Sequence, residues 1–206
     1  MQDGLRERLV LDRVGPAVIG TAAGLDVAYG PDDRLAAAVV VLDAGTLAEV
    51  DRAVVTGRAE FPYVPGLFAF RELPALAEAL TALRTVPDLL VCDGHGIAHP
   101  RRFGLACHLG VLTGLPSVGV GKTPLVGTWT GPGPRRGDSA PLVDGAETVG
   151  RVLRSQDGVK PVFVSVGSGI DLDTATRHVL ALAPRYRVPE TTRAADRLSR
   201  QALRAG

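Results

Sequence analysis

The sequence predicts an α/β protein built on one mixed β-sheet that is flanked by helices. Apolar segments joined by short turns over residues 24–55 predict an antiparallel three-strand meander. The order strand, helix, strand over residues 87–120 predicts a parallel crossover. A length of 206 residues and a hydrophobic content of 46% fit a single domain over residues 1–206.

The overall composition excludes several classes of protein. The chain has 23 basic and 22 acidic residues, so nucleic-acid binding would have to come from local patches rather than from net charge. Cys92 and Cys107 are too few for a zinc site and are expected to be reduced and buried. The N-terminus has no apolar core typical of a signal peptide, and no segment is long enough to span a membrane. We therefore expect a cytoplasmic protein without a membrane partner.

The first three strands are expected at residues 24–30, 35–43 and 47–55. Side chains alternate along a strand, so the first strand places Asp26 on the face opposite to its larger apolar residues. The unbroken apolar character of residues 35–43 predicts a strand that is covered on both faces. Short turns between these segments complete the meander.

The next segment combines a stiff loop with a helix. Two prolines and a glycine in residues 61–66 fix the position of Tyr63. Proline is tolerated only in the first turn of a helix, so we expect the helix to begin just before Pro74, with Glu72 in or near its first turn. Apolar residues at helical spacing mark its buried face: Leu73, Leu76, Ala77, Leu80 and Leu83.

A glycine-rich turn follows the fourth predicted strand. Residues 89–92 lead into Asp93, and a short strand at residues 117–120 ends at Lys122. Ligands of parallel sheets bind at the carboxyl ends of the strands, where both charged residues fall. The helix expected over residues 104–112 should bury Leu105, Leu109 and Leu112.

The last third of the chain is expected to contain a loop, a hairpin and two helices. Residues 129–144 are rich in glycine, proline and arginine, which predicts an exposed loop. Residues 147–153 and 161–166 are strand candidates that form a hairpin. Asp171 caps a helix that reaches about Leu182, and Pro189 opens the last helix. That helix carries Arg193, Asp196, Arg197 and Arg200.

Three acids, Asp26, Glu72 and Asp93, form the candidate site. If the strand of Asp93 pairs beside the strand of Asp26, the two carboxylates approach and repel each other unless a cation lies between them. Mg²⁺ is held by a few carboxylates together with water and phosphate, and such a site can generate a hydroxide that hydrolyses a phosphodiester. Singly, Asp26 could be an ordinary strand residue and Asp93 a turn former. The combination with Glu72 and Lys122 favours a metal site.

Five stretches of the chain resemble the endonuclease V family, the deoxyinosine-directed repair nucleases. The similarity extends over about residues 20–200, and the glycine-histidine-arginine stretch is the most specific part. The matching stretches are residues 24–27, 62–66 with 70–72, 93–102, 118–122 and 186–193. The resemblance implies an RNase H-like core.

The resemblance also implies roles for charged residues at the site. It makes Asp26, Glu72 and Asp93 ligands of Mg²⁺, with Mn²⁺ able to substitute. Asp196 matches a fourth position near the metals, although an acid between two arginines on a helix surface explains it equally well. Lys122 would contact the phosphate near the scissile bond.

On the nucleic-acid side, the resemblance makes Tyr63 a wedge that replaces the stacking of an extruded base, with a core tyrosine as the alternative. His99 matches a histidine beside the active site, and His95 a variable position. Arg101 and Arg102 would hold backbone phosphates. Backbone groups at three glycines, with an apolar neighbour, would read the base: Gly66, Gly96, Gly104 and Leu125.

One departure from the family concerns residues 167–169, where relatives commonly have Gly-His-Arg and this chain has Gly-Ser-Gly. The expected function is a monomeric, Mg²⁺-dependent endonuclease that hydrolyses the second phosphodiester bond 3′ to deoxyinosine in DNA and leaves a 5′-phosphate. Two alternatives remain open: an endoribonuclease directed to inosine in RNA, and a lesion-binding protein without turnover. A small-molecule α/β enzyme is disfavoured because the glycine turn lacks the spacing of a dinucleotide-binding motif.

Overall fold

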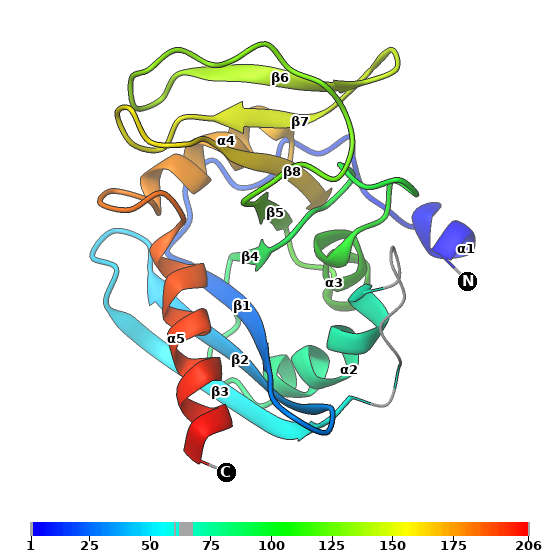
Figure 1. The fold of residues 1–206 in the computed structure, drawn as a ribbon, viewed down its shortest axis with the longest axis vertical. Helices are drawn as coiled ribbons and strands as arrows, with labels where there is room; N and C mark the ends of the chain where they lie inside the picture. Colours follow the sequence, from blue (N-terminus) through cyan, green and yellow to red (C-terminus); the bar gives the residue numbers. More distant parts are fainter. Residues whose placement is uncertain (1, 60, 62–67, 206) are drawn as a thin grey trace.

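The computed structural model describes residues 2–59, 61 and 68–205, which form one eight-stranded sheet with helices on both faces (Figure 1). The strands are β1 Thr21–Tyr29, β2 Arg34–Asp43, β3 Glu49–Arg58, β4 Leu89–Asp93, β5 Ser117–Gly121, β6 Ser139–Asp144, β7 Glu147–Leu153 and β8 Val162–Ser168. The helices are α1 Gln2–Arg6, α2 Phe68–Thr81, α3 Leu105–Thr113, α4 Leu172–Ala181 and α5 Glu190–Ala205.

The strand order is β3-β2-β1-β4-β5-β8-β7-β6. The expected meander is confirmed, because β2 pairs antiparallel with both β1 and β3. The expected crossover is also confirmed, because β4 is parallel to β1 and to β5. Strands β7 and β8 form the expected antiparallel pair, and β6 extends the sheet beyond β7. The mixed sheet therefore places the carboxyl ends of three neighbouring parallel strands, β1, β4 and β5, at one edge.

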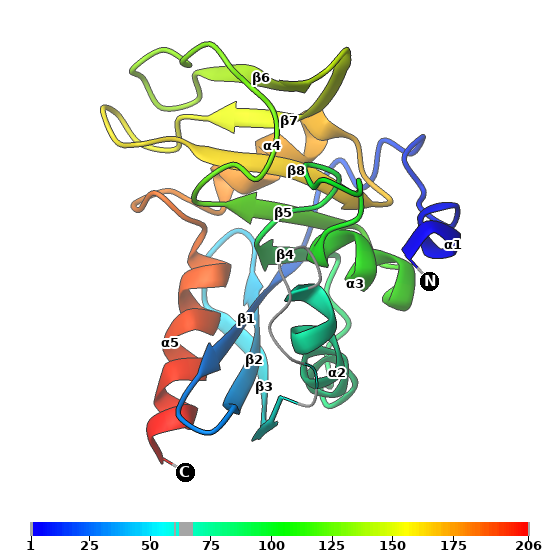
Figure 2. The same ribbon diagram turned by 45° about the vertical axis from the view of Figure 1, so that its right-hand side comes forward.

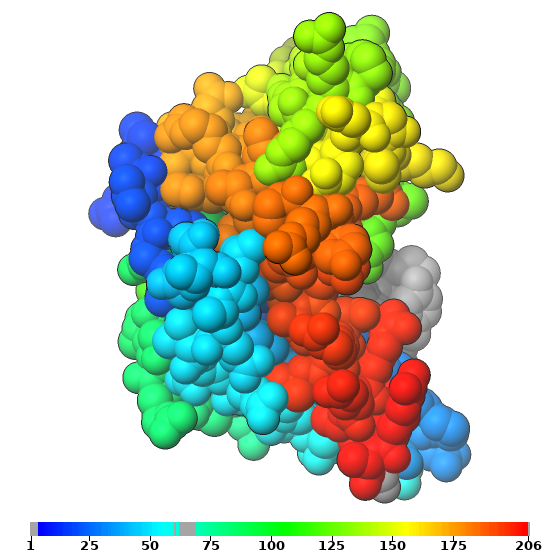
Figure 3. Space-filling model, turned by 90° about the vertical axis from the view of Figure 1, so that its left-hand side faces the viewer, coloured from blue at the N-terminus to red at the C-terminus, as the bar shows by residue number. Residues whose placement is uncertain are grey.

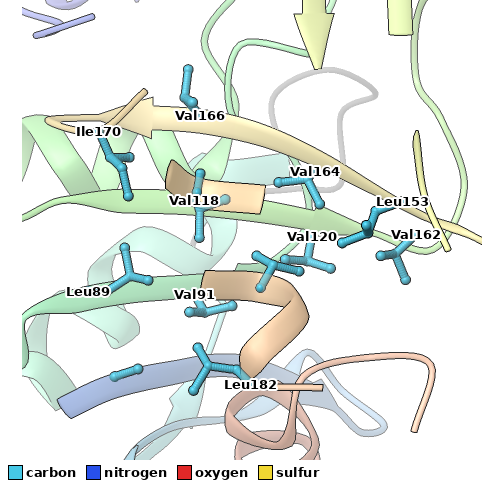
Figure 4. Close-up of a cluster of buried hydrophobic side chains, with 13 residues drawn as sticks. Leu89, Val91, Val118, Val120, Leu153, Val162, Val164, Val166, Ile170 and Leu182 are labelled. Carbon is cyan, nitrogen blue, oxygen red and sulfur yellow. The ribbon is translucent and has the colours of Figure 1, made fainter. Parts of the chain in front are cut away.

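Two apolar cores lie on opposite faces of the sheet. On one face, valines and leucines of β4, β5 and β8 pack with α4 (Figure 4). On the other face, residues of β1, β2 and β4 pack under α2 and α3. Figure 2 shows α5 on one side of β1 and β2, with α2 and α3 on the other side. Cys92 and Cys107 are free thiols in this interior, as expected.

Helix α2 begins earlier than the sequence suggested. It starts at Phe68, so Pro74 lies inside the helix and Glu72 lies beyond its first turn. The prediction that the helix begins just before Pro74 is therefore wrong. An internal proline removes one backbone hydrogen bond and costs about 3 kcal/mol. Burial of Leu76 and Ala79 against the sheet offsets that cost, so packing overrides local propensity here.

Two further expectations are corrected. Residues 129–144 are not wholly a loop, because Ser139–Asp144 forms the strand β6 with Ala140 and Leu142 buried. This strand lies at the edge of the sheet, which is where a strand can accommodate a proline such as Pro141. Leu112 is 57% exposed, because α3 is covered all round from Leu105 to Gly110 and uncovered in its last turn. Among the described residues, no helix is long and apolar enough to cross a membrane.

Candidate active site

Asp26 and Asp93 lie side by side on one face of the sheet. In the parallel pair β1 and β4, Leu25 is the register partner of Cys92, and each acid is the next residue of its strand. Ala22 and Val91 belong to the same apolar cluster, and the two acids have the same strand parity as these residues. Both carboxylates therefore face the side of the sheet that α5 covers.

Asp26 is held from the side of α5. The hydroxyl of Ser199 donates a hydrogen bond to Oδ2 of Asp26 at 2.6 Å. Burial raises the pKa of Asp26 above its usual range, and the hydrogen bond from Ser199 acts in the opposite direction. The negative charges of Asp93 and Asp196 raise this pKa further. A cavity of about 480 Å³ opens beside these groups, and its walls include Asp26, Asp93, Lys122, Asp196 and Arg200.

Glu72 reaches the two aspartates from α2, on the other face of the sheet. Its side chain is buried, and burial together with the charges of Asp26 and Asp93 raises its pKa to about 8. Loss of water is the larger cause and like-charge repulsion the smaller. Glu72 is therefore protonated at neutral pH unless additional positive charge enters the cluster.

Two basic side chains already pair with acids of the cavity. Lys122 Nζ forms an ion pair with Asp93 Oδ2, and Arg200 lies 2.8 Å from Asp196. The backbone of Lys122 is also fixed, because Arg187 Nη2 donates to its carbonyl at 2.5 Å and to the carbonyl of Pro161 at 2.8 Å. Lys122 thus lies at the end of β5, and its ammonium group contacts the acid cluster.

The donor set suits a hard divalent cation. Besides burial, the charge of Asp93 raises the pKa values of Asp26 and Glu72, and the charge of Asp26 raises that of Glu72, which indicates negative charge that is not fully neutralised. Carboxylate oxygens are the ligands that Mg²⁺ and Mn²⁺ prefer. As they stand, no three His, Cys, Asp or Glu side chains of residues 2–59, 61 and 68–205 are arranged to hold one ion. In this arrangement Oδ2 of Asp93 is paired with the ammonium of Lys122.

The glycine-rich turn after Asp93 packs against the protein's own backbone. A Cβ at Gly96 would lie 1.9 Å from the carbonyl oxygen of Val166, and one at Gly104 would lie 2.3 Å from that of His95. Side chains at these two positions are sterically excluded whether or not a base binds. Packing therefore requires glycine at both positions, independently of their expected role in reading the base.

The two histidines of the turn are bound to nearby backbone groups. His95 Nε2 lies 2.9 Å from the carbonyl oxygen of Thr123, which assigns the proton to Nε2 in a neutral ring. The amide of Arg101 donates to His99 Nδ1 at 3.2 Å. Burial lowers the pKa of both rings. The histidines are therefore neutral at physiological pH, and their hydrogen bonds to the backbone stabilise the turn.

Comparison with known proteins places the chain in a family. The family model described as Endonuclease V matches residues 3–197. The chain belongs to the endonuclease V family. It is 62% identical to the endonuclease V of Nocardia farcinica over 100% of this chain and 91% of the relative.

Solved structures of endonuclease V share the fold. The crystal structure from Streptomyces avermitilis has a TM-score of 0.95 and 58% identity, covering 99% of this chain and 90% of that one. The Ciona intestinalis endonuclease V, in complex with a 24mer DNA containing an inosine followed by a ribo-adenosine, has a TM-score of 0.85 and 25% identity. It covers 99% of this chain and 95% of that one. The expected RNase H-like fold is confirmed, and membership of the endonuclease V family supports a hydrolytic endonuclease.

The residues expected to contact nucleic acid are placed less uniformly. Arg102 pairs with Asp144 at 2.7 Å and Glu147 at 2.8 Å, so a phosphate would compete with two carboxylates. Arg101 and Leu125 are exposed. The predicted roles of Tyr63 and Gly66 concern positions outside the described residues.

Sequence reasoning missed the residues that support the acids. Ser199 is fully buried on the sheet-facing side of α5, among alanines and a leucine. A polar residue on the apolar face of an amphipathic helix, three positions after Asp196, was a signal that could have identified it. Arg187 gave no comparable signal, because its contact with Lys122 joins segments 65 residues apart.

Proposed function

We propose that this chain is a divalent-metal-dependent endonuclease that recognises deoxyinosine in DNA. It hydrolyses the second phosphodiester bond on the 3′ side of the lesion and leaves 3′-hydroxyl and 5′-phosphate ends. One observation carries the proposal: Asp26, Glu72 and Asp93 interact electrostatically beside Lys122 at one edge of the sheet, in a chain of the endonuclease V family.

The acids provide the metal ligands in this mechanism. Asp26, Asp93 and Glu72, with Asp196 as a fourth candidate, would hold Mg²⁺, and Mn²⁺ could replace it. Bound metal of this kind supplies a water of lowered pKa and positive charge for the leaving oxygen. Glu72, whose pKa is raised to about 8, would have to lose its proton to serve as a ligand. Lys122 is suited to stabilise the negative charge that develops on the scissile phosphate.

The lesion is bound on the side of the glycine-rich turn. Tyr63 acts as the wedge, and backbone groups of three glycines read the extruded base beside Leu125. His99 supports the turn, and Arg101 and Arg102 lie toward the phosphates. The complex of the Ciona relative with inosine-containing DNA supports this ligand class. The three glycines are Gly66, Gly96 and Gly104.

The decisive experiment uses an end-labelled duplex with one deoxyinosine, incubated with and without Mg²⁺. We expect one nick, mapped to the second bond 3′ to the lesion, which disappears with Asp93→Ala and persists with the exposed control Asp12→Ala. Circular dichroism should show that both variants are folded. A fully active Asp93→Ala enzyme would contradict the proposed mechanism.

A second candidate is cleavage of inosine-containing RNA. The Ciona relative was solved with a ribo-adenosine after the inosine, which favours testing a ribonucleotide at that position. Cleavage rates on matched DNA and RNA oligonucleotides with a single inosine separate the two activities. Tight binding with no nick in Mn²⁺ would instead support a binding protein without turnover.

The proposed enzyme is a cytoplasmic monomer in which residues 1–206 act as a single domain. The continuous pairing of all eight described strands supports the single domain. Light scattering after size exclusion, with and without substrate DNA, tests the monomer. A stable dimer that is required for nicking would contradict it.

A further inference from the structure

The hydroxyl of Ser199 donates a hydrogen bond to one of the two carboxylate oxygens of Asp26. Ser199 is fully buried in α5, and its Oγ donates to Oδ2 at 2.6 Å. The other oxygen, Oδ1, has no hydrogen-bond partner among residues 2–59, 61 and 68–205. Asp26 also lines the cavity that contains Asp93 and Asp196. One oxygen is thus held by the protein and the other is left available.

The proton of Ser199 has two possible acceptors. Oγ also lies 3.0 Å from the backbone carbonyl of Asp196, but a hydroxyl has only one proton to donate. Hydrogen bonds to a charged carboxylate are shorter and stronger than those to a neutral carbonyl. The proton therefore goes to Asp26 whenever this acid is ionised, which is the form that binds a cation.

Close packing of α5 on β1 keeps Ser199 in place. A Cβ at Gly24 would lie 2.0 Å from the carbonyl oxygen of Thr191, so the start of the helix touches the strand backbone. Farther along, Gly30 faces Leu203, and Figure 1 shows α5 running along β1. Ser199 lies between these two contacts. It can neither withdraw from Asp26 nor follow a large movement of its carboxylate.

We propose that Ser199 is a positioning residue that makes Asp26 a one-oxygen ligand and thereby selects Mg²⁺ or Mn²⁺ over Ca²⁺. This inference rests on the proposed metal-dependent function. Mg²⁺ requires near-ideal octahedral geometry with ligands at about 2.0–2.1 Å, whereas Ca²⁺ accepts two oxygens of one carboxylate at about 2.3–2.6 Å. A cation at Oδ2 of Asp26 would compete with the proton of Ser199, so Oδ1 is the favoured ligand atom, and a single-oxygen contact suits the smaller ion.

Ser199→Ala should change ion preference rather than simply weaken the site. Loss of an orienting hydrogen bond behind a ligand lowers metal affinity by about 10- to 100-fold, which we expect for Mn²⁺. Ca²⁺ gains a two-oxygen contact with the released Asp26, so its affinity should not fall. The ratio of the two dissociation constants, Ca²⁺ over Mn²⁺, should decrease at least about tenfold. Ser199→Thr retains the hydroxyl and should restore the ratio.

The test measures metal binding by the full chain without substrate. Mn²⁺ binding is followed by the electron paramagnetic resonance signal of the free ion, and Ca²⁺ binding by competition. Ser117→Ala is the matched control, because Ser117 is also fully buried and its Oγ donates at 2.8 Å to the backbone carbonyl of Ala106. Thermal melts of all variants compare their folding.

A lowered ratio in Ser199→Ala alone supports the inference. Equal weakening of both ions, or no change in either, overturns it. If wild-type Mn²⁺ binding is lost in Asp93→Ala and the ratio still does not move, only the role of Ser199 fails. If wild-type Mn²⁺ binding does not depend on Asp93, the proposed metal site is wrong and the role of Ser199 fails with it.

Discussion

Lys122 Nζ is ion-paired with Asp93 Oδ2, so the residue that follows β5 neutralises the last residue of β4. The pair is partly exposed, with side-chain exposures of 50% for Lys122 and 23% for Asp93. In the proposed mechanism Asp93 would hold a cation, which would compete with Lys122 for this carboxylate. The ammonium of Lys122 is suited to contact the phosphate. Lys122 would therefore both compete with metal and assist catalysis.

These two roles predict opposite effects of Lys122→Met. The rate at saturating Mg²⁺ should fall by about 10²-fold, because a group that stabilises transition-state charge is lost. The Mg²⁺ concentration at half-maximal rate should not rise, because Asp93 loses its competitor. Lys160→Met, an exposed lysine, serves as the control. A raised Mg²⁺ requirement at an unchanged rate would contradict both roles.

Glu72 predicts a pH-dependent stability for the metal-free protein. Its pKa is raised from 4.5 to about 8, so its stabilising contribution is complete below pH 4.5 and is lost as the pH rises through 8. Glu72→Gln cannot ionise and should avoid this loss. Its advantage in unfolding free energy should therefore grow by a few kcal/mol between pH 5 and pH 9. Urea denaturation at several pH values measures this difference, and parallel curves for the two proteins would refute it.

Metal should stabilise the folded protein through the same acids. A ligand at about 100 times its dissociation constant adds about 2.7 kcal/mol to the unfolding free energy. We expect Mg²⁺ to raise the melting temperature of the wild type and to have little effect on Asp93→Asn. Differential scanning fluorimetry across a Mg²⁺ series, with K⁺ at equal ionic strength, makes the comparison. An equal rise in both proteins would show that Mg²⁺ acts elsewhere.

Gly96 should be intolerant of any side chain. A Cβ would lie 1.9 Å from the carbonyl oxygen of Val166, so Gly96→Ala forces the turn away from β8 and should cost more than about 3 kcal/mol. Gly131→Ala is the matched control, since a Cβ there meets no atom within 4 Å. Urea denaturation of the two variants gives the comparison. Equal stability would mean that the turn is free to move.

Pro74→Ala should stabilise the protein. Alanine restores the amide that an α-helix uses to bond the carbonyl of Phe70, and it removes the clash of the proline ring. The gain is offset in part because alanine increases the freedom of the unfolded chain, which leaves a net effect of about 1 kcal/mol. The urea midpoint measures it, and a lower midpoint would show that the helix is built around the proline.

The hydrophobic pattern of the sequence correctly predicted those elements that are determined by their own residues. The alternation around Asp26 and the apolar run before Asp93 located both strands, and the strand-helix-strand order predicted that β4 is parallel to β5. The parallel pairing of β4 with β1 is established by the structure. The hydrophobic pattern failed where tertiary contacts determine the structure. Packing against the sheet maintains α2 across Pro74, and the position of β6 at the edge of the sheet accommodates Pro141.

The candidate site likewise contains residues that the sequence predicted and residues that it did not. The three acids were predictable as a set, with the help of the family resemblance, but the groups that hold them were not. Ser199 contacts Asp26 across 173 residues, and Arg187 contacts Lys122 across 65. The position of Ser199 on the apolar face of its helix marks it as unusual, but the sequence does not show which residue it contacts. The partners of Ser199 and Arg187 are identified only in the folded chain.

The separation of 173 residues between Ser199 and Asp26 also bears on when the site comes into existence. Contacts between distant parts of a chain form late, because the entropy of closing the intervening loop must first be overcome. A partly folded copy can therefore contain the meander and still lack the finished arrangement around Asp26. If the proposed function is correct, a partly folded copy would lack the complete metal site and should have no nuclease activity.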